Sequence, residues 1–593
     1  MLEDKIKKLI QQALRSVFSH EPKDINLATP DAQFGDFAFT CHSLAKDLKQ
    51  SPQEIASKIA GALAGHGNIT AQAVAGYVNI TVLPALLGKE VLGAVLKEKN
   101  NYGHHKKTTD KAVLEYSSPN TNKPLHLGHI RNNVLGMALY NLLSSQGAKV
   151  IPVQIINDRG IHIIKSMLAY QKWGQGQTPK AAGEKGDHFV GKFYVLFEKE
   201  FEQEWQEYLN NNKVTGDLAK ARQEFFGQSR IGQEAQVMLR VWEQGEKSVR
   251  ALWKKMNQWV YAGFGATYKV LGSEFKKNYF ESKTYLLGKA IVAEGFKKGV
   301  FYREADGSVW VDLTADGLDK KILQRADGTS VYITQDLGLA VQRHKEFKFT
   351  SLAYVVGHEQ EYHFKVLFLI LQKLGYAWAK KLRHLSYGLV FLPEGKMKSR
   401  EGKVVDADDI MAEVVELARE QITKRQTGIK AKERERRAQA IGLGALKFFL
   451  LRVTPTQSIH FNPAEAIAFE GATGPYVQYA HARIASILKS AKAGSIGKTD
   501  LSKLSTLEEK AVLLKLLAYP KAVSDAAQNY SPNIVCDYLV GLAQAFNTFY
   551  HKHQVLKAED KATRAARLLL IKATQIVLAN GLALLGIEAP DKM

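Results

Sequence analysis

The sequence predicts an α/β protein built around a parallel sheet that is wrapped by helices. Two stretches carry this prediction, because residues 111–156 and residues 351–391 each read as a strand, a helix and a second strand. Their strands, such as "KAVLEYS" and "SLAYVV", are largely apolar runs, which is typical of strands buried on both faces of a parallel sheet. With 593 residues, the chain is long enough for several domains, each with its own core.

The pattern of elements divides the chain into three regions. Residues 1–107 mix helices with short strands, residues 108–465 contain the two strand–helix–strand units, and residues 466–593 read as helical. Within the middle region, the polar, glycine-rich segment 174–186 and the amphipathic helices after it are interpreted mainly as insertions carried by the sheet. In the last region, Ser505-x-x-Glu508 predicts a helix start.

Composition bounds the partners and the compartment. The net charge of +22 indicates either a polyanionic partner such as nucleic acid or a basic surface without a specific role. Cys41 and Cys536 fall in different regions, so we expect neither a disulfide framework nor a Cys-based zinc site. No apolar run is long enough to span a bilayer, and the N-terminal stretch lacks the core of a signal peptide. We therefore expect a cytoplasmic protein without a membrane span.

The stretch "NTNKPLHLGHIRNNVLG" (120–136) lies where the first unit leaves its strand and enters its helix. Ligands of open parallel sheets bind at this edge, and a helix N-terminus favours anions. Gly128 lets a ligand approach the backbone, and Lys123 adds a positive charge. His126 and His129 share one face of a helical turn, where they could stabilise charge during phosphoryl or nucleotidyl transfer. The alternative is two surface histidines beside a turn, and a zinc site is the less favoured reading.

A second, basic segment follows the strand that ends at Phe391. The run "PEGKMKSREGKVV" (393–405) holds Lys396 and Lys398 between glycines. Such a loop at the end of a sheet strand can fold over a triphosphate, although alone it is more typical of a charged surface turn. Together with residues 120–136, it predicts a nucleotide held from both halves of one sheet.

This pair of motifs resembles the signatures of class I aminoacyl-tRNA synthetases, a His-x-Gly-His motif and a Lys-Met-Ser-Lys-Ser loop. Among these enzymes the chain is most similar to the arginyl-tRNA synthetase family, over almost its whole length. The similar segments are "SSPNTNKPLHLGHIRNN", "GDHFVGKFYVLFEK", "VYITQDLGLAVQRHKEF", "FEGATGPYVQYAHARIASIL" and "LLGIEAPDKM". The sequence departs from the family at the second lysine of the loop, where "KMKSR" offers Lys398 or Ser399, and after the second strand, at Gln154 and Asp158.

The resemblance implies a Rossmann-like catalytic domain with helical insertions over 108–465. It also implies an N-terminal α+β domain that contacts the tRNA elbow over 1–107, and an all-α anticodon-binding domain over 466–593. The expected protein is a ligase of protein biosynthesis, a monomer without a structural metal. It would activate L-arginine with ATP and Mg²⁺ to arginyl-adenylate and pyrophosphate, and transfer the arginyl group to the 3′ end of tRNA(Arg). In this family tRNA is also needed for the first step.

The resemblance also assigns the site residues. Catalysis would depend on Lys123, His126, His129, Lys396 and Lys398, and ATP would be bound by His126, Gly128, His129 and Lys396. The arginine contacts would be Ser118, Asn120, His129, Tyr332, Asp336 and Gln360, and the tRNA contacts Tyr476, Tyr479, Arg483 and Met593. No residue is assigned to a metal.

Two of these assignments have a physical rationale of their own. A carboxylate meets a planar guanidinium in a bidentate manner, so Asp336, one helical turn after Tyr332, suits arginine, although such a pair is more often a surface contact. Glu115 is a further acid, or else an edge-strand charge. A helix stripe of Tyr476, Tyr479 and Arg483 suits stacking on anticodon bases, with core packing as the alternative. 

Three other functions are compatible with parts of the pattern. Small-metabolite adenylyltransferases share the His-x-Gly-His motif but lack a Tyr-bearing helical C-terminal domain. A non-catalytic relative would be expected to have lost Lys123, His126, His129 or Asp336, all of which are present. A class I synthetase for another amino acid is disfavoured by the pair of Tyr332 and Asp336.

Overall fold

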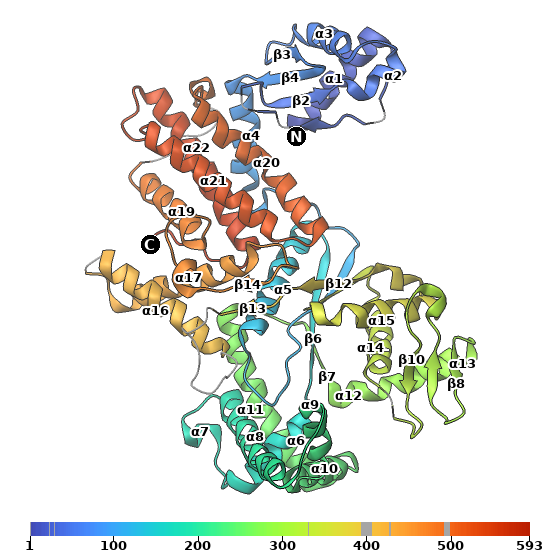
Figure 1. The fold of residues 1–593 in the computed structure, drawn as a ribbon. Coiled ribbons are helices and arrows are strands. Elements are labelled where there is room, and N and C mark those ends of the chain that lie inside the picture. Colours follow the sequence, from blue (N-terminus) through green and yellow to red (C-terminus); the bar gives the residue numbers. More distant parts are fainter. Residues whose placement is uncertain are drawn as a thin grey trace.

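A five-stranded parallel sheet lies in the middle of the molecule (Figure 1). The computed structural model describes residues 2–22, 24–28, 30–31, 33–329, 331–392, 406–425, 428–491 and 498–593. The strands are β5 (Lys111–Glu115), β6 (Lys149–Ile156), β7 (Lys277–Phe280), β11 (Ser351–Gly357) and β12 (Leu382–Tyr387), in the order β12-β11-β5-β6-β7. Each neighbouring pair is parallel, which confirms the predicted fold class.

Helices cover both faces of this sheet, as the apolar strands predict. They include α5 (Leu127–Ser145), α14 (Tyr332–Phe347) and α15 (Glu361–Lys373). Leu114 of β5 packs in one core with Val134 of α5, whereas Val113 packs in another with Leu337 of α14 and Leu367 of α15. Because β5 is central and the strand order reverses between β5 and β11, ligands are expected at the carboxyl ends of these two strands.

The second unit ends differently from the prediction. The stretch 385–391 was expected to form one strand, but β12 ends at Tyr387, and β13 (Val390–Phe391) leaves the sheet to pair with β14 (Ile459–His460). The cause is Arg131, a buried residue of α5 whose guanidinium donates to the carbonyl oxygens of Gly388 and Leu389. The Arg131 side chain therefore holds both carbonyls, and that of Leu389 also accepts from the N–H of Ile459 in β14 at 2.9 Å, which directs the chain from β12 toward β14.

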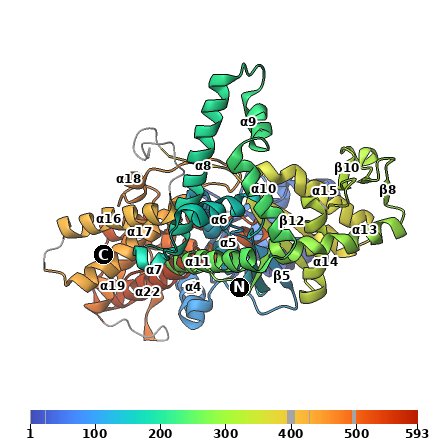
Figure 2. The same ribbon diagram turned by 90° about the horizontal axis from the view of Figure 1, so that it is seen from below.

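Two insertions separate the strands. The first, between β6 and β7, is helical as predicted: α6 (Ile161–Trp173), α7 (Pro179–Ala182), α8 (Gly186–Asn211), α9 (Leu218–Phe226), α10 (Arg230–Glu243) and α11 (Lys247–Leu271). The ends of α8 and α9 project away from the rest of the molecule (Figure 2). The second holds α12 (Glu281–Thr284), α13 (Gly288–Lys297) and an antiparallel sheet of β8 (Phe301–Arg303), β9 (Val309–Val311) and β10 (Lys321–Gln324). This sheet was not predicted, because its strands are too short to show a period.

The N-terminal region forms a small α+β unit at one end of the molecule (Figure 1). It contains α1 (Leu2–Phe18), β1 (Leu27–Ala28), β2 (Phe37–Thr40), α2 (Ala45–Leu48), α3 (Pro52–Leu63), β3 (Ile69–Val74) and β4 (Tyr77–Val82), with an antiparallel sheet. The next helix, α4 (Pro84–Glu98), packs against two C-terminal helices, α20 (Leu507–Asn529) and α22 (Lys561–Leu584). Cys41 is buried in this unit and Cys536 in α21 (Asn533–Lys552), and both thiols are free.

The C-terminal region is helical, as predicted. Its helices, with three that begin before residue 466, are α16 (Ala407–Arg425), α17 (Ala431–Leu451), α18 (Pro463–Ala466), α19 (Gly474–Lys489), α20 (Leu507–Asn529), α21 (Asn533–Lys552) and α22 (Lys561–Leu584). The predicted capping pair of Ser505 and Glu508 is wrong by one residue, because Thr506 and Glu509 form the capping box of α20. The register is fixed by Glu509, which is fully buried and paired with Arg567.

The last helix, α22, is long and apolar. By length and hydropathy α22 is able to cross a membrane, but 72% of its apolar window is buried. It packs against α19, α20 and α21. Its hydrophobic surface is therefore accounted for by the helical domain.

Candidate active site

Two cavities meet at the carboxyl ends of β5 and β11. The larger has a volume of about 990 Å³ and the smaller about 230 Å³. Ser118, Val356 and Gln360 line both, so the two cavities share a wall at the point where the strand order reverses. This is the edge at which the sequence placed the two signature motifs.

The paired histidines line the larger cavity at the start of α5. The Nδ1 atom of His126 accepts a hydrogen bond from the backbone N–H of Gly128 at 3.1 Å. The Nδ1 atom of His129 accepts one from the backbone N–H of His126 at 3.2 Å, and the two rings lie 3.9 Å apart. Because both Nδ1 atoms accept, each neutral ring carries its proton on Nε2 and can donate it to a ligand.

Burial and nearby charge keep both imidazoles neutral. Burial lowers the pKa of His126 to about 4, with a further contribution from the Lys123 ammonium. Burial also lowers the pKa of His129 well below its usual value, with contributions from His126 and Lys123. Near pH 7 the two histidines therefore act as hydrogen-bond donors, and Lys123, on the preceding loop, supplies the positive charge.

Gly128 has a second reason to be glycine. A Cβ atom at this position would lie 3.0 Å from Cε1 and 3.1 Å from Nδ1 of His126. A side chain would therefore press on the imidazole that caps α5, in addition to filling the cavity that Gly128 lines.

The turn after β5 is strained and carries a free hydroxyl. Ser117 and Ser118 have φ angles of 77° and 53°, a region that residues other than glycine rarely adopt. Asn132 of α5 stabilises the turn, since its Oδ1 atom accepts from the backbone N–H of Ser117 and its amide donates to the carbonyl oxygen of Val355 at 2.8 Å. The buried Oγ atom of Ser118 has no hydrogen-bond partner among the described residues. Since Ser118 lines both cavities, this hydroxyl is available to a ligand.

The smaller cavity is lined by two acids. The Oδ2 atom of Asp336 lies 2.7 Å from Nε2 of His363, and its side chain is 38% exposed. Glu115 is buried and ion-paired with Arg343, which is fully buried. Since β5 is the central strand, the alternative that Glu115 is an edge-strand charge is wrong.

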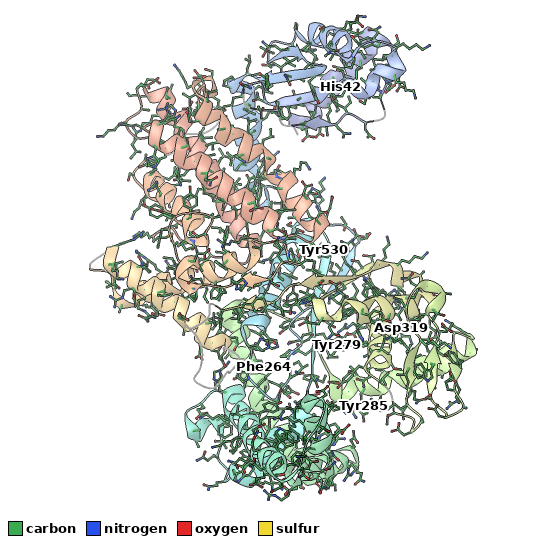
Figure 3. All side chains as sticks on the ribbon, in the orientation of Figure 1. His42, Phe264, Tyr279, Tyr285, Asp319 and Tyr530 are labelled. Atoms are coloured by element: carbon green, nitrogen blue, oxygen red, sulfur yellow. The ribbon has the colours of Figure 1, made fainter. Side chains whose placement is uncertain are left out.

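The buried pair balances the charge of this pocket. Burial raises the pKa of Glu115, and the Arg343 guanidinium opposes that shift. The guanidinium lies 4.8 Å from the ring of Tyr279, on β7, and 5.8 Å from that of Tyr354, on β11; Tyr279 is labelled in Figure 3. With Glu115 matched by Arg343, the carboxylate of Asp336 gives the cavity a net negative charge suited to a single cation.

The remaining predicted ligands divide into three groups. Asn120 lines the larger cavity, together with His126, Gly128 and His129. Tyr332 begins α14, one turn before Asp336, but it is 72% exposed and lines neither cavity. Lys396 and Lys398 lie outside the described residues.

Both flanks of the predicted basic loop are at the larger cavity. Phe391 and Leu392 line it on one side. On the other, Asp406 forms a backbone bridge with His126, and the N–H of Ala407 donates to the carbonyl oxygen of Leu125 at 2.9 Å.

Comparison with known proteins decides the family. Residues 91–462 match the family described as tRNA synthetases class I (R), catalytic domain; residues 477–593 match the DALR anticodon binding domain, and residues 4–82 the arginyl tRNA synthetase N terminal domain. The arginine–tRNA ligase of Porphyromonas gingivalis is 45% identical over 595 residues, covering 98% of each chain. That of Phocaeicola vulgatus is 44% identical over 100% of each chain. The arginyl-tRNA synthetase structure from Thermus thermophilus is similar with a TM-score of 0.80 and 27% identity, covering 100% of both chains. The chain belongs to the arginyl-tRNA synthetase family.

In this family member, the predicted anticodon stripe lies on α19. Arg483 donates to the hydroxyl of Tyr479 at 3.1 Å, and its guanidinium lies over the rings of Tyr479 (4.7 Å) and Tyr550 (5.2 Å). The hydroxyl of Tyr476 accepts a hydrogen bond from Asn547. Tyr479 remains 37% exposed, so the stripe is held in place and still open to a partner.

The C-terminal tail of this synthetase lies along the same helix. Gln478 donates to the carbonyl oxygen of Glu588 at 2.8 Å, and the Nδ1 atom of His481 lies 3.0 Å from the carbonyl oxygen of Pro590. Met593 is partly buried against the core that includes α19. The tail therefore runs along the helix that carries the stripe, and a contact of Met593 with tRNA stays a prediction.

The departures from the family pattern have structural roles. Asp158 is buried and accepts hydrogen bonds from Ser282 and Tyr261, which ties the end of β6 to α12 and α11. Gln154 bonds to Tyr268 and to Asn278 of β7. These contacts hold the sheet edge together behind the cavities.

Sequence reasoning missed three residues of the pockets: Asn132, Arg343 and His363. A weak signal existed for two of them. Arg343 follows Asp336 by seven residues, which places both on one face of α14, and His363 follows Gln360 by three. Neither spacing identifies the partner, since Arg343 of α14 pairs with Glu115 of β5, and His363 of α15 pairs with Asp336 of α14.

Proposed function

We propose that the chain is an arginine–tRNA ligase. It activates L-arginine with ATP to arginyl-adenylate, with release of pyrophosphate, and transfers the arginyl group to the 3′ end of tRNA(Arg). The observation that carries this proposal is the pair of joined cavities, one with imidazole donors at a helix N-terminus and the other with an acid that has no arginine partner.

In the first step, the arginine carboxylate attacks the α-phosphate of ATP in line and pyrophosphate leaves. No protein nucleophile is required, so the site acts by positioning and by stabilising charge. His126 and His129 donate Nε2–H hydrogen bonds to the phosphate oxygens, and Lys123 contributes positive charge. Lys396 and Lys398, on the basic loop, supply further cations to the leaving pyrophosphate.

Magnesium enters as the complex with ATP. Among the described residues that line the larger cavity, Glu359 is the single carboxylate. Mg²⁺ prefers an octahedral shell of oxygens and keeps much of its water, so one acid and the triphosphate fit this mode of binding better than a dedicated protein site. The ion would neutralise phosphate charge.

The arginine substrate spans the shared wall of the cavities. Its guanidinium is held by Asp336 in the smaller cavity, with Tyr332 covering the opening. Ser118, Asn120 and Gln360 lie between Asp336 and the histidines and bind the amino and carboxylate groups. An amino acid without a planar cation would leave Asp336 with its contact to His363 alone, and the missing guanidinium bonds are the basis of rejection.

The tRNA is bound at several places along the chain. Tyr476, Tyr479 and Arg483 stack on anticodon bases, with Met593 at the edge of this surface, and the N-terminal unit contacts the elbow. The proposed domains are 1–107, 108–465 and 466–593, in a cytoplasmic monomer. A terminal adenosine hydroxyl of the tRNA then attacks the arginyl-adenylate, and bound tRNA is needed for the first step as well.

Arginine-dependent ATP–pyrophosphate exchange in the presence of tRNA tests the proposal. Exchange should be specific to arginine among the twenty amino acids. Equal exchange with lysine or valine would show that the pocket is assigned wrongly. Charging of tRNA with labelled arginine then tests the second step.

A further inference from the structure

One segment similar to the family, residues 186–199, has no role in the function described above. It forms the first turns of α8, which belongs to the insertion and not to the sheet. A Cβ atom at Gly191 would lie 2.8 Å from Cδ of Pro124 and 3.6 Å from Cα of Lys123. The backbone of α8 therefore packs directly on the loop that carries Lys123 and leads to His126.

The start of α8 is fixed in turn by α11. A Cβ atom at Gly186 would lie 2.0 Å from the carbonyl oxygen of Trp259. A Cβ atom at Gly263 would lie 2.1 Å from Oδ1 of Asp187, a fully buried carboxylate. The first turn of α8 therefore packs closely against α11, which fixes the position of α8 relative to the loop that carries Lys123.

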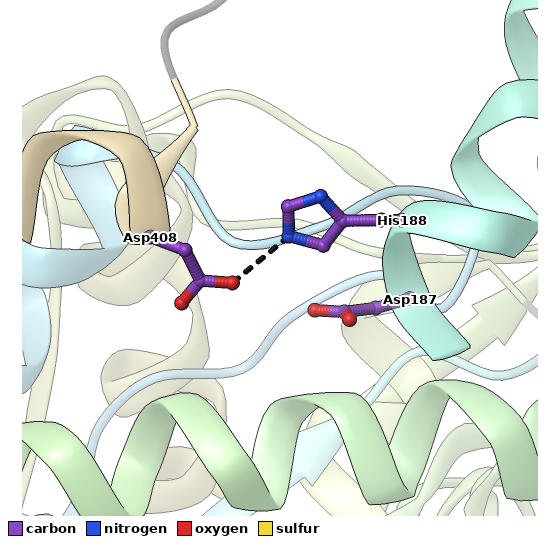
Figure 4. Close-up of side chains that lie close together, drawn as sticks. All are labelled: Asp187, His188 and Asp408. Carbon is purple, nitrogen blue, oxygen red and sulfur yellow. Dashed lines mark hydrogen bonds and ion pairs between the residues drawn. The ribbon is translucent and has the colours of Figure 1, made fainter. Parts of the chain in front are cut away.

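Charged side chains connect this support to the start of α16. The ammonium of Lys185 lies 3.0 Å from Oδ2 of Asp187 and 2.5 Å from Oδ2 of Asp408, and it also bonds to the hydroxyl of Thr267. The Nε2 atom of His188 lies 2.8 Å from Oδ2 of Asp408 (Figure 4). We refer to Lys185, Asp187, His188 and Asp408 as the α8–α16 cluster.

The cluster does not require a metal ion. One ligand atom from each of Asp187, His188 and Asp408 lies within 4.8 Å of the others, a spacing that could hold a cation. However, Lys185 bonds to both carboxylates, so an ammonium already supplies the positive charge between them.

The residues beside Asp408 reach the nucleotide cavity. Asp406, which lies 3.4 Å from the His188 ring, forms the backbone bridge with His126. Ala407 donates its N–H to the carbonyl oxygen of Leu125 at 2.9 Å. A displacement of residues 406–408 would therefore move the backbone that presents the His126 ring.

We propose that the α8–α16 cluster positions the nucleotide site: Lys185 and His188 hold Asp408, and residues 406–408 hold Leu125 and His126 in place for ATP. These side chains are positioning residues, because none of them lines either cavity. The inference rests on the proposed function, since ATP is the ligand whose binding it affects.

The test compares Lys185→Met, His188→Gln and Asp408→Asn with the wild type in ATP–pyrophosphate exchange with tRNA. A misplacement of about 1 Å can cost 10²-fold in rate, so we expect kcat/KM for ATP to fall roughly 10–100-fold, while KM for arginine stays unchanged. Lys185→Arg keeps the charge and should retain most of the activity. Lys192→Met removes an exposed ion pair of the same helix, with Glu184, and should behave as the wild type.

The pH profile separates positioning from a purely structural role. The hydrogen bond to Asp408 raises the pKa of His188, and the nearby carboxylates of Asp406 and Asp187 raise it further. Burial and the Lys185 ammonium oppose this shift. In Lys185→Met, His188 is left to hold Asp408 together with Thr267. The positive charge of His188 is present below its raised pKa and is lost as the pH rises through that pKa. We therefore expect this variant, and not Lys185→Met/His188→Gln, to lose activity toward alkaline pH more steeply than the wild type.

The outcomes are distinguishable. Absence of arginine-dependent exchange in the wild type would overturn the proposed function itself. Wild-type exchange with unchanged KM and kcat for ATP in folded variants, checked by thermal melting, would overturn the positioning role. An equal rise in the KM values for ATP and for arginine would also overturn the positioning role. His188→Gln keeps the test informative if the others misfold, because this side chain is 32% exposed.

Discussion

The arginine pocket and the anticodon stripe both present charge and aromatic rings, yet they present them differently. In the pocket, Arg343 is fully buried between Tyr279 and Tyr354, and its charge is matched by Glu115. On α19, the Arg483 guanidinium lies over Tyr479, which stays 37% exposed. In the proposed function, the same residue types therefore select arginine in one place and bind tRNA in the other.

The difference lies in the cost of a missing partner. An amino acid without a cation that fills the pocket displaces the water around Asp336, so nothing replaces the bonds that the carboxylate loses. An exposed ring or guanidinium that loses a base is simply rehydrated. We therefore expect pocket substitutions to change which amino acid is used, and stripe substitutions to change how tightly tRNA binds.

The largest expected effect is at Asp336. Asp336→Asn should lower kcat/KM for arginine by roughly 10⁴–10⁵-fold, because the site loses the charge that pairs with the guanidinium. The exposed acid Asp312 offers the control Asp312→Asn, which should leave exchange unchanged. Retained arginine use in Asp336→Asn, with tRNA binding intact, would place the specificity elsewhere.

The next effect is at the nucleotide. His129→Ala should lower kcat of exchange by roughly 10²–10³-fold, since one preorganised donor to the developing phosphate charge is lost. The exposed His551 on α21 provides the control His551→Ala. A variant with normal kcat would show that the Nε2 donor does not face the reacting phosphate.

A pH effect on stability follows from the depressed pKa of His126. Its pKa of about 4 lies below the usual 6.5, so between these values the unfolded chain binds a proton that the folded chain does not. Stability should therefore fall as the pH drops from 6.5 toward 4, by up to roughly 3 kcal/mol for this group. Urea unfolding at several pH values measures this effect. Between pH 6.5 and 4, the free energy of unfolding of His126→Asn should fall less than that of the wild type. An unchanged pH dependence in that variant would mean that the imidazole is not buried as described.

The smallest effect is on the stripe. Tyr479→Ala should weaken tRNA binding by about 1–3 kcal/mol, the range for one base stacked on an aromatic ring, and leave KM for arginine unchanged. Tyr140 has the same exposed fraction, 37%, on another helix, so Tyr140→Ala is a matched control. Equal tRNA affinities for the two variants would remove α19 from the proposed interface.

The sequence predicted the elements whose pattern is long and local. The sheet strands and α5 follow from apolar runs, and the His126–His129 geometry follows from a spacing within one helical turn. The β8–β10 sheet was missed because its strands have three or four residues. The cap of α20 was placed one residue early, because the burial of Glu509 against Arg567 decides between two similar patterns.

The parts of the site that were not predicted depend on packing between distant segments. The ion pair of Glu115 and Arg343 joins β5 to α14, and no local pattern marks it. The positive φ angles of Ser117 and Ser118 depend on Asn132, which lies on the next helix. The contact of α8 with the signature loop depends on Gly191, whose role is visible only once Pro124 lies against it.

The central claim is that one carboxylate beside the nucleotide cavity selects a planar cation. The most direct measurement is ATP–pyrophosphate exchange with tRNA for arginine and for citrulline, which has nearly the same shape but no charge. We predict a preference for arginine of roughly 10⁴-fold or more in kcat/KM, which Asp336→Asn largely removes. Comparable kcat/KM values for the two amino acids in the wild type would contradict the claim.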